Sequence, residues 1–428
     1  MITETLNNLL HQTAFFNLDW GNYVMIAVAC FFLYLAIKHE FEPLLLVPIA
    51  FGMLLTNLPF SGLYHAELWN PSTNPYFAPE YVQEGANLLI TYTKEVSLDY
   101  GKVLHEGGLL DMLYLGVKLG IYPPIIFLGI GAMTDFGPLI ANPKSFLLGA
   151  AAQGGIFFTF LGACAINALG LGDGFSLKQA ASIAIIGGAD GPTAIFTTIK
   201  LAPHLLGPIA IAAYSYMALV PVIIPLVVKL LCSKKELMIN MKEQEKLYPS
   251  KTEIKNLRVL KIIFPIAVTT IVALFVPTAV PLIGMLMFGN LIKEIGSDTS
   301  RLFDAAANSI MNAATIFLGL SVGATMTSEA FLNWTTIGIV IGGFLAFALS
   351  ITGGIFFVKL FNLFSKKKIN PLIGATGLSA VPMASRVCNE IATKYDPKNH
   401  VLNYCMSSNI SGVIGSAVAA GVLISFLG

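Results

Sequence analysis

The acidic residue Asp190 lies within an apolar stretch, in the sequence GGADGPTA. A carboxylate in such a stretch is costly, and is by default a functional candidate. The motif contains three glycines that free backbone carbonyls, Gly187, Gly188 and Gly191. Pro192 can begin a half-helix, and Thr193 adds a hydroxyl. Oxygen atoms of these kinds suit a hard cation such as Na⁺. The alternative is an interfacial turn in which Asp190 caps the next helix.

A second apolar stretch, 370–391, is interrupted by Gly374, Gly377 and Pro382. It offers three oxygen donors, Asn370, Thr376 and Ser379. Arg386 follows Ser379 by seven residues, which on a continuous helix is two turns along one face. Its guanidinium is able to clamp a carboxylate with two hydrogen bonds. An interfacial arginine that reaches the headgroups or pairs with Glu390 explains it equally well.

Two further polar side chains lie within apolar segments. Tyr216 offers a phenol to an ion or a proton, although most buried tyrosines only satisfy one hydrogen bond in the core. Asn409 belongs to the polar cluster SSNIS in the last apolar segment, where hydrogen bonding between helices is an equal alternative. The sequence has no Walker A loop, GxGxxG motif or HExxH motif, and its histidines have no metal-ligand spacing.

The composition indicates which kind of molecule positions these residues. Hydrophobic residues make up 55% of the 428 positions, and charged residues only 11%, against about 25% in soluble proteins. The net charge of +1 lacks the basic footprint of a nucleic-acid binder. Five scattered cysteines without a CxxC pair indicate neither a disulfide framework nor a zinc site. We therefore expect an all-α polytopic membrane protein, and no cleaved signal peptide because the N-terminus lacks a basic region.

About ten segments are apolar enough to be predicted as spans. They cover residues 20–37, 44–58, 109–133, 145–171, 205–231, 259–276, 282–295, 303–326, 334–360 and 400–427. Two further stretches, 179–199 and 370–391, are broken by glycine and proline. Eight lysines and arginines in 233–261, and Lys366–Lys368, predict that these loops are cytoplasmic, whereas the acidic stretch 59–108 is predicted outside. If 179–199 crossed the membrane fully, the basic loop would lie outside. Re-entrant hairpins at the two breaks remove this conflict, so each break is expected to line a cavity covered by protein.

The chain also repeats itself at a constant offset. The sequence IFLG at 126–129 recurs at 316–319, Pro192 matches Pro382, and Tyr214 matches Tyr404. The predicted topology makes the two halves inverted, and inverted repeats with facing broken helices are the architecture of many ion-coupled transporters. The resulting division comprises N-terminal spans (1–58), a polar insert (59–108), a first repeat (109–231), a basic loop (232–258), linking spans (259–302) and a second repeat (303–428).

Three long motifs resemble the β subunit of the biotin-dependent, Na⁺-translocating decarboxylases, which act on oxaloacetate, methylmalonyl-CoA, glutaconyl-CoA or malonate. They are GGADGPTAIF at 187–196, NPLIGATGLSAVPMASR at 370–386, and GIYPPIIFLGIGAMTDFGPLIANP at 120–143. The resemblance covers the chain from about Gly107 to the C-terminus. It implies a membrane-embedded pump that decarboxylates carboxybiotin, consumes a proton and exports Na⁺ across the bacterial cytoplasmic membrane.

Carried over residue by residue, the resemblance implies that Asp190 is the essential acid of the Na⁺ site. Tyr216 and Ser379 would lie in the ion path, with Asn370, Gly374 and Arg386 as further functional residues. Asp190, Tyr216 and Arg386 are thus the catalytic candidates, while Asn409 is added from the repeat. Carboxybiotin would come from a partner, since the implied complex contains a carboxyltransferase subunit, a biotin carrier and a small membrane-anchored γ or δ subunit. The resemblance also allows a homo-oligomeric β subunit within that complex.

A second function fits the residues alone: a Na⁺-coupled secondary transporter of small carboxylates, in which Arg386 would hold the substrate. Inverted repeats and broken helices would look the same in both. The two differ in that the pump needs a biotinylated partner, whereas the transporter acts alone. A passive channel is disfavoured because the sequence has no K⁺-type filter or acidic ring. The resemblance implies that the soluble carboxyltransferase subunit, and not this chain, selects the acid that is decarboxylated.

Overall fold

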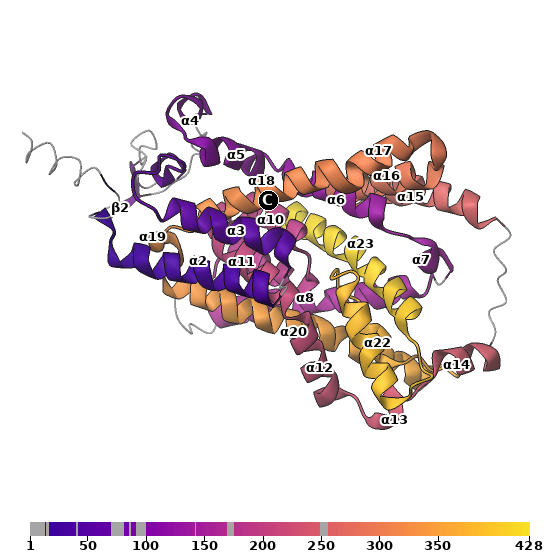
Figure 1. Ribbon diagram of the computed structural model, residues 1–428. Coiled ribbons are helices and arrows are strands. Elements are labelled where there is room, and N and C mark those ends of the chain that lie inside the picture. The colour runs from indigo at the N-terminus through magenta and orange to yellow at the C-terminus, as the bar shows by residue number, and fades with distance from the viewer. Residues whose placement is uncertain are drawn as a thin grey trace, which may run out of the picture.

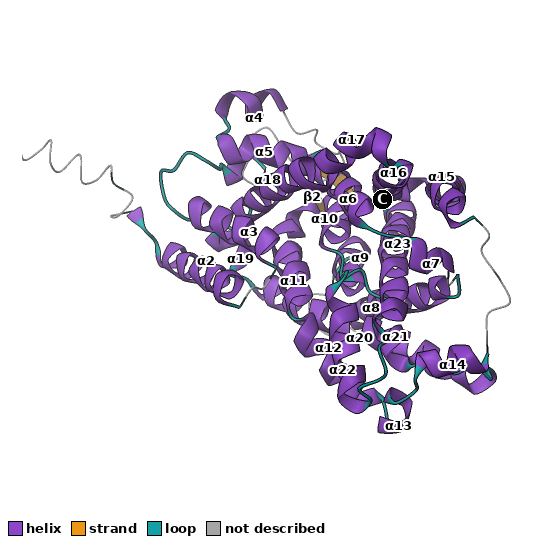
Figure 2. Cartoon of the chain, turned by 45° about the vertical axis from the view of Figure 1, so that its right-hand side comes forward, coloured by secondary structure: helices purple, strands orange, loops and turns teal. Residues whose placement is uncertain are grey.

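The computed structural model describes residues 13, 17–39, 42–69, 81–84, 87–90, 100–141, 143–168, 175–248 and 256–428. These residues form a bundle of helices (Figures 1 and 2). One small antiparallel hairpin, which the sequence did not predict, pairs β1 (Tyr81–Glu84) with β2 (Asn87–Ile90). Parts of the predicted N-terminal spans, polar insert and basic loop, including Lys251 and Lys255, lie outside the described residues.

Seven helices among the described residues are long and apolar enough to cross a membrane, or nine if each of two bent pairs is one span. The straight spans include α2 (Trp20–Lys38), α8 (Ser145–Ala168), α15 (Leu257–Phe275), α16 (Val280–Ile295), α18 (Met311–Ala324), α20 (Trp334–Phe364) and α23 (Leu402–Leu427). The bent pairs are α5 (Leu109–Lys118) with α6 (Tyr122–Met133), and α11 (Leu206–Ala218) with α12 (Val220–Leu231). The remaining predicted segment, 44–58, corresponds to α3 (Pro43–Thr56), which at 14 residues is shorter than a full span. The protein is thus a multi-pass helical membrane protein, but the count of ten spans is not confirmed.

Short elements connect and interrupt the spans. They are η2 (Ala66–Leu68), α4 (Tyr100–Glu106), α7 (Gly137–Ala141), α9 (Leu177–Ala184), η3 (Ile185–Gly188), α10 (Gly191–Leu201), η4 (Pro203–Leu205), α13 (Lys234–Leu237), α14 (Met241–Leu247), η5 (Pro277–Ala279), η6 (Ser297–Thr299), α17 (Ser300–Asp304), η7 (Ala305–Ile310), α19 (Ser328–Phe331), α21 (Pro371–Ala375) and α22 (Met383–Tyr395). The predicted basic loop therefore contains two helices, α13 and α14.

The order of elements repeats in the two halves. A span, a short helix, a long helix, a broken helix pair and another helix follow one another as α6 to α11, and again as α18 to α23. Corresponding helices begin at Tyr122 and Met311, at Gly137 and Ser328, at Ser145 and Trp334, and at Gly191 and Met383. These pairs keep nearly the register of the sequence repeat. The inverted sense of the two halves, and the domain division built on it, stay predictions.

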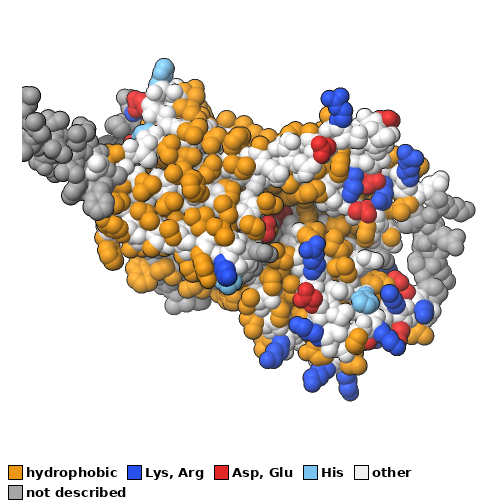
Figure 3. Space-filling model, in the orientation of Figure 1, with side chains coloured by type: hydrophobic (Ala, Val, Ile, Leu, Met, Phe, Trp, Pro, Cys, Tyr) orange, Lys and Arg blue, Asp and Glu red, His pale blue; other side chains and the backbone are white. Residues whose placement is uncertain are grey.

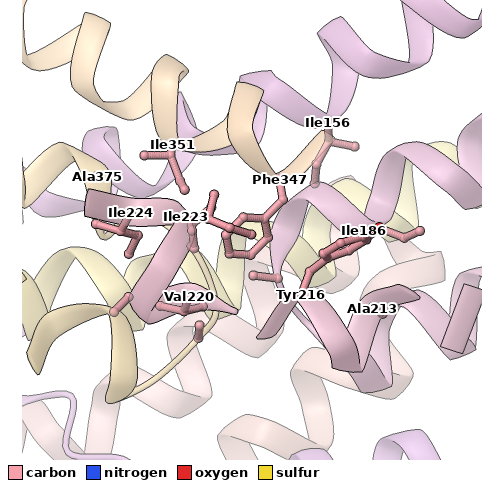
Figure 4. Close-up of a cluster of buried hydrophobic side chains, with 14 of the residues drawn as sticks. Ile156, Ile186, Ala213, Tyr216, Val220, Ile223, Ile224, Phe347, Ile351 and Ala375 are labelled. Atoms are coloured by element: carbon pink, nitrogen blue, oxygen red, sulfur yellow. The ribbon is translucent and has the colours of Figure 1, made fainter. Parts of the chain in front are cut away.

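The largest apolar core lies where α8, α11, α12, α20 and the two broken pairs meet. Figure 4 shows Ile186, Tyr216 and Phe347 packed together in this core, with Val220 and Ile351 beside them. Glycines bring two of its helices close together: a methyl group on Gly374 would lie 2.2 Å from the carbonyl oxygen of Gly354. Only glycine at both positions lets α21 lie directly on α20.

The surface separates apolar from charged regions. In Figure 3 hydrophobic side chains cover most of the visible face, while charged side chains gather over α13, α14 and the end of α22, and around α15 to α17. Many large hydrophobic side chains are exposed, Trp20, Phe158, Phe275 and Phe364 among them. Exposed apolar surface on this scale suits a lipid environment rather than water.

Candidate functional site

The two broken helix pairs meet in the interior of the bundle. The backbone N–H of Ser379, between α21 and α22, donates a hydrogen bond of 2.9 Å to the carbonyl of Gly188, at the end of η3. Ala189 takes a left-handed conformation with φ of +53°, so the chain leaves η3 and turns into α10. The structure thus brings together the two breaks that the repeat predicts to face each other.

Asp190 is the N-cap of α10 and is 4% exposed. Its Oδ1 accepts the backbone N–H of Thr193 at 3.1 Å. Its Oδ2 accepts two hydroxyl groups, from Ser379 at 2.9 Å and from Ser416 on α23 at 2.8 Å. The capping alternative raised by the sequence is therefore true as well, but it accounts for only one of the two carboxylate oxygens.

A second buried carboxylate, Asp111 on α5, shows what a purely structural site looks like. Its oxygens accept the backbone N–H groups of His65 and Gly108 and the indole N–H of Trp69, at 2.6–3.2 Å, and the His65 Nδ1 lies 2.8 Å from Oδ2. The backbone and indole N–H donors have no lone pair to offer a cation. Each hydroxyl at Asp190, in contrast, is both donor and acceptor and can rotate. The hydroxyls that hold Asp190 can therefore either donate a hydrogen bond to its carboxylate or, after rotation, coordinate a cation through an oxygen lone pair.

Asn409 on α23 lies against the second break. Its amide nitrogen donates to the carbonyl of Leu378, and its Oδ1 accepts the hydroxyl of Ser385 at 3.3 Å. The side chain is completely buried. Asn409 thus holds Leu378, the residue before Ser379, and so supports the contact between Ser379 and Asp190 indirectly.

Two of the predicted oxygen donors are occupied by the protein itself. Asn370 caps α21 by accepting the N–H of Leu372, and its amide donates to the carbonyls of Leu237 and Ile239. The Thr376 hydroxyl donates to the carbonyls of Ile373 and Cys405. These contacts give both side chains a role in anchoring α21, and neither touches Asp190.

Tyr216 and Arg386 lie differently from the sequence expectation. The Tyr216 hydroxyl donates to the carbonyl of Val340 on α20. Arg386 is exposed on α22 and forms no ion pair within the described part of the chain, so the pair with Glu390 is not made. The prediction that Ser379 and Arg386 share one continuous helix face is wrong. Residues 376–382 are not helical, because the Ser379 N–H bonds across to Gly188 and Pro382 has no N–H to offer.

The motif glycines permit close packing around the site. A methyl group on Gly191 would lie 2.0 Å from the ring of Tyr214, and one on Gly187 would lie 2.8 Å from the Ser350 hydroxyl. At Gly377 it would approach the carbonyl of Leu148 to 2.8 Å. These positions, like Gly374, are glycines because a side chain does not fit.

Sequence reasoning missed three residues at the site: Gln153, Tyr214 and Ser416. The Gln153 amide donates to the carbonyls of Gly377 and Gly412 at 3.1 and 3.4 Å, while its Oε1 is buried without a partner. A methyl group on Gly188 would lie 3.3 Å from that oxygen. The amide side chain of Gln153, between alanines and glycines in the sequence AAAQGG, was the available signal.

Tyr214 packs against the residue that follows Asp190, whereas Tyr216 packs beside Ile186 in η3. The Tyr214 ring packs on Gly191, directly after Asp190, and its buried hydroxyl has no hydrogen-bond partner among the described residues. The Thr193 hydroxyl is also buried and lies against the Asp190 carboxylate. Together with Gln153 Oε1, these atoms surround the Asp190 region with oxygens whose lone pairs are not used. The donor set is a carboxylate, hydroxyls and an amide oxygen, which are the ligands that hard cations prefer.

Comparison with known proteins connects this site to a family. A family model described as the Na⁺-transporting oxaloacetate decarboxylase beta subunit matches residues 21–427. This chain belongs to that family. The match reaches much further toward the N-terminus than the motifs from Gly107 onward that first indicated the resemblance.

Curated relatives of the β-subunit family agree over nearly the whole chain. Methylmalonyl-CoA decarboxylase subunit beta of Propionigenium modestum is 52% identical over 99% of this chain and 100% of its own. Oxaloacetate decarboxylase beta chain 2 of Salmonella typhimurium is 46% identical, covering 99% of both chains. Glutaconyl-CoA decarboxylase subunit beta of Acidaminococcus fermentans is 44% identical, over 99% of this chain and 98% of its own. The protein is thus a membrane subunit of a Na⁺-transporting decarboxylase, and the alternative of a secondary transporter acting alone is not favoured.

Proposed function

We propose that this β subunit decarboxylates carboxybiotin and uses the reaction to export Na⁺, with Asp190 as the ion-binding acid. The observation that carries the proposal is the meeting of Asp190 with Ser379 and Ser416. A buried carboxylate, two rotatable hydroxyls and two broken helices converge at one point. Broken helices that face each other near the middle of the membrane are where ion-coupled transporters hold their ions.

The cation site we propose uses oxygens from both repeats. Asp190 and Thr193 come from the first break and Ser379 from the second, while Ser416 belongs to α23 and Gln153 to α8. On Na⁺ binding the two serine hydroxyls turn their hydrogens away from Asp190 Oδ2 and present lone pairs. The Oε1 of Gln153, which has no hydrogen-bond partner among the described residues, then gains one, which removes the free-energy cost of leaving it unpaired.

Charge balance provides the coupling. A carboxylate buried in the bilayer needs a compensating charge, either Na⁺ or a proton. When bound, carboxybiotin supplies the driving reaction, which releases CO₂ and takes up one proton on the ring nitrogen. We propose that Arg386, whose exposed guanidinium has no ion-pair partner in the described chain, attracts the carboxylate of the incoming carboxybiotin. Tyr216 and Asn370 would support the ion path through the backbone segments that they hold.

The complex would contain a carboxyltransferase subunit, a biotin carrier and a small membrane-anchored γ or δ subunit. We place the α13–α14 region on the cytoplasmic side of a bacterial inner membrane, because lysines concentrate there. The soluble biotin-bearing partner would then approach this end.

The proposal is tested with the purified complex in proteoliposomes whose β-subunit cytoplasmic face is outward. Addition of the acid substrate should drive ²²Na⁺ into the vesicles, and avidin, which captures the carrier's biotin, should abolish uptake. Uptake that continues unchanged in avidin, or that this chain supports without a biotinylated partner, would overturn the proposed function.

A further inference from the structure

A polar pocket opens beside the α13–α14 region, away from Asp190. Its volume is about 570 Å³. The walls come from α7, α14, the end of α22 and the first turn of α23. The polar lining comprises Lys242, Glu245, Asn389, His400, Asn403 and Tyr404. None of these side chains takes part in the site described above.

The wall formed by α14 is held in place by the second broken pair. Asn240, the N-cap of α14, donates to the carboxylate of Asp396 at 3.2 Å. Asn399 donates to the carbonyl of Ile239 at 3.0 Å, and Gln244 accepts the backbone N–H of Lys368 at 2.9 Å. Hydrogen bonds on both sides of α14 thus hold this wall of the pocket in a defined position.

The lining combines a free cation with neutral polar groups. Lys242 forms no salt bridge within the described residues, and its side chain is exposed at the pocket. Asn403 offers an amide donor and acceptor and Asn389 an amide donor, since its Oδ1 accepts the N–H of Leu402 at 3.1 Å, while Pro138 and Leu402 supply apolar surface. The one acidic lining group, Glu245, lies against the Tyr404 hydroxyl. This arrangement fits a small, flat, neutral ring with an attached carboxylate, since amides pair with a cyclic urea and Lys242 with the anion.

The position of the pocket connects it to the ion site. Asn389 lies one turn along α22 from Arg386, on the same side of the helix. The preceding residue, Ser385, bonds to Asn409, which in turn supports the loop that carries Ser379. α22 therefore connects the pocket, through Arg386 and Ser385, with the loop that carries Ser379.

We propose that this pocket is the docking subsite for the carboxybiotin ring of the partner, occupied before the carboxylate moves to Arg386. The inference rests on the proposed function, and it adds a site for the ureido ring and a role for Lys242. The chemistry recognised is a cyclic urea that bears a carboxylate and is tethered through its side chain.

The binding test uses Asn403→Cys in the complete complex, with Glu243→Cys as the matched control. Both positions are exposed at the same end, but only Asn403 lines the pocket. N-acetylbiocytin amide, a mimic of the biotinylated lysine, is added at about four times its Kd. Alkylation by N-ethylmaleimide, followed on each cysteine peptide by mass spectrometry, should slow about fivefold at position 403 and not at 243. Equal rates at 403 with and without the probe would overturn the docking site.

The kinetic test compares Lys242→Gln with Lys246→Gln, an exposed lysine of the same helix that does not line the pocket. Lys242→Gln should raise the KM for the carboxylated carrier about tenfold, the effect of losing one charged contact, and leave the KM for Na⁺ unchanged. Unaltered carrier KM in Lys242→Gln, with avidin-sensitive Na⁺ uptake intact, would overturn the pocket and spare the proposed function. Uptake that is insensitive to avidin in the wild-type complex would instead overturn the proposed function.

Discussion

Hydroxyl groups distinguish the Asp190 carboxylate from the other buried acid, Asp111. Asp111 is held by backbone and indole N–H groups and by the ring nitrogen of His65, and no hydroxyl contacts it among the described residues. The donors to Asp190 Oδ2 are Ser379 and Ser416, whose oxygens also serve as cation ligands. Two serines, from separate parts of the second repeat, therefore give Asp190 hydroxyl partners that can also bind a cation.

Replacement of Ser416 by alanine should weaken Na⁺ binding without removing the acid. Loss of a hydrogen bond or ligand contact at a charged group corresponds to about 1.5–3 kcal/mol, so the KM for Na⁺ should rise about tenfold or more. The measurement is Na⁺-dependent decarboxylation by the purified complex. Ser411→Ala is the control on the same helix, because its hydroxyl bonds only to the carbonyl of Phe146. Equal Na⁺ KM values for the two variants would contradict a ligand role for Ser416.

Local motifs in the sequence pointed to residues that the structure brings together, while their role in Na⁺ binding stays a prediction. Asp190 and Ser379 stand in Gly/Pro-broken stretches, and the structure brings them into contact. Ser416 and Gln153 were missed because their helices are mostly apolar and their polar residues do not form one face. Such a helix has no amphipathic pattern to show which face meets the break.

At the scale of elements, the two broken pairs are positioned by close helix contacts. Glycine and proline in the sequence predicted where the helices break, but not the length of each piece or the bend at residues 376–382. Those details depend on long-range bonds such as Ser379 N–H to Gly188, which local sequence does not encode. The approach of α21 to α20 depends in the same way on two glycines far apart in the chain, Gly354 and Gly374.

A methyl group at Gly374 should push α21 away from α20. The added carbon would lie 2.2 Å from the Gly354 carbonyl oxygen, and backbone at that distance cannot yield cheaply. Overpacking of this kind costs about 1–3 kcal/mol, so Gly374→Ala should lower the Tm of the detergent-solubilised protein and reduce Na⁺ transport. Gly154→Ala has open space around it and should change neither. A Gly374→Ala protein with unaltered Tm and transport would contradict this packing.

The α13–α14 region is tied to α20 by an ion pair. Lys359 lies 3.0 Å from Glu236 and also donates to the carbonyl of Leu231. Burial opposes ionisation of Glu236, but hydrogen bonds from the Ser233 backbone and from Lys359 outweigh it and lower the pKa of the carboxyl. The pair therefore stabilises the folded chain when Glu236 is ionised.

Glu236→Gln should destabilise the protein slightly at neutral pH, by about 0.2–1 kcal/mol for a pair that is partly exposed. Because the folded-state pKa of Glu236 is lowered, its contribution is complete above the ordinary value of 4.5 and disappears as the pH falls through the folded-state value. The Tm difference between wild type and variant should therefore shrink on acidification, as measured by thermal unfolding from pH 7 to pH 4. A difference that grows at acidic pH would contradict the assigned sign.

At the scale of the whole molecule, composition and the repeat predicted much of the architecture. Scarcity of charge indicated a membrane protein, and the order of elements from α6 to α11 recurs from α18 to α23. The number of spans was harder to predict, because it depends on whether each bent helix pair and the short α3 count as a membrane crossing. Residues of both repeats meet at Asp190. The central prediction is therefore that Na⁺ movement depends on this acid.

The most direct test is ²²Na⁺ uptake by proteoliposomes that contain the complete complex with Asp190→Asn. The matched control is Asp135→Asn, which neutralises an acid whose side chain is 55% exposed and pairs with Lys261 away from the breaks. The account predicts uptake at background for Asp190→Asn and near wild type for Asp135→Asn, in complexes of equal subunit content. Near-wild-type, substrate-driven uptake by Asp190→Asn would contradict it.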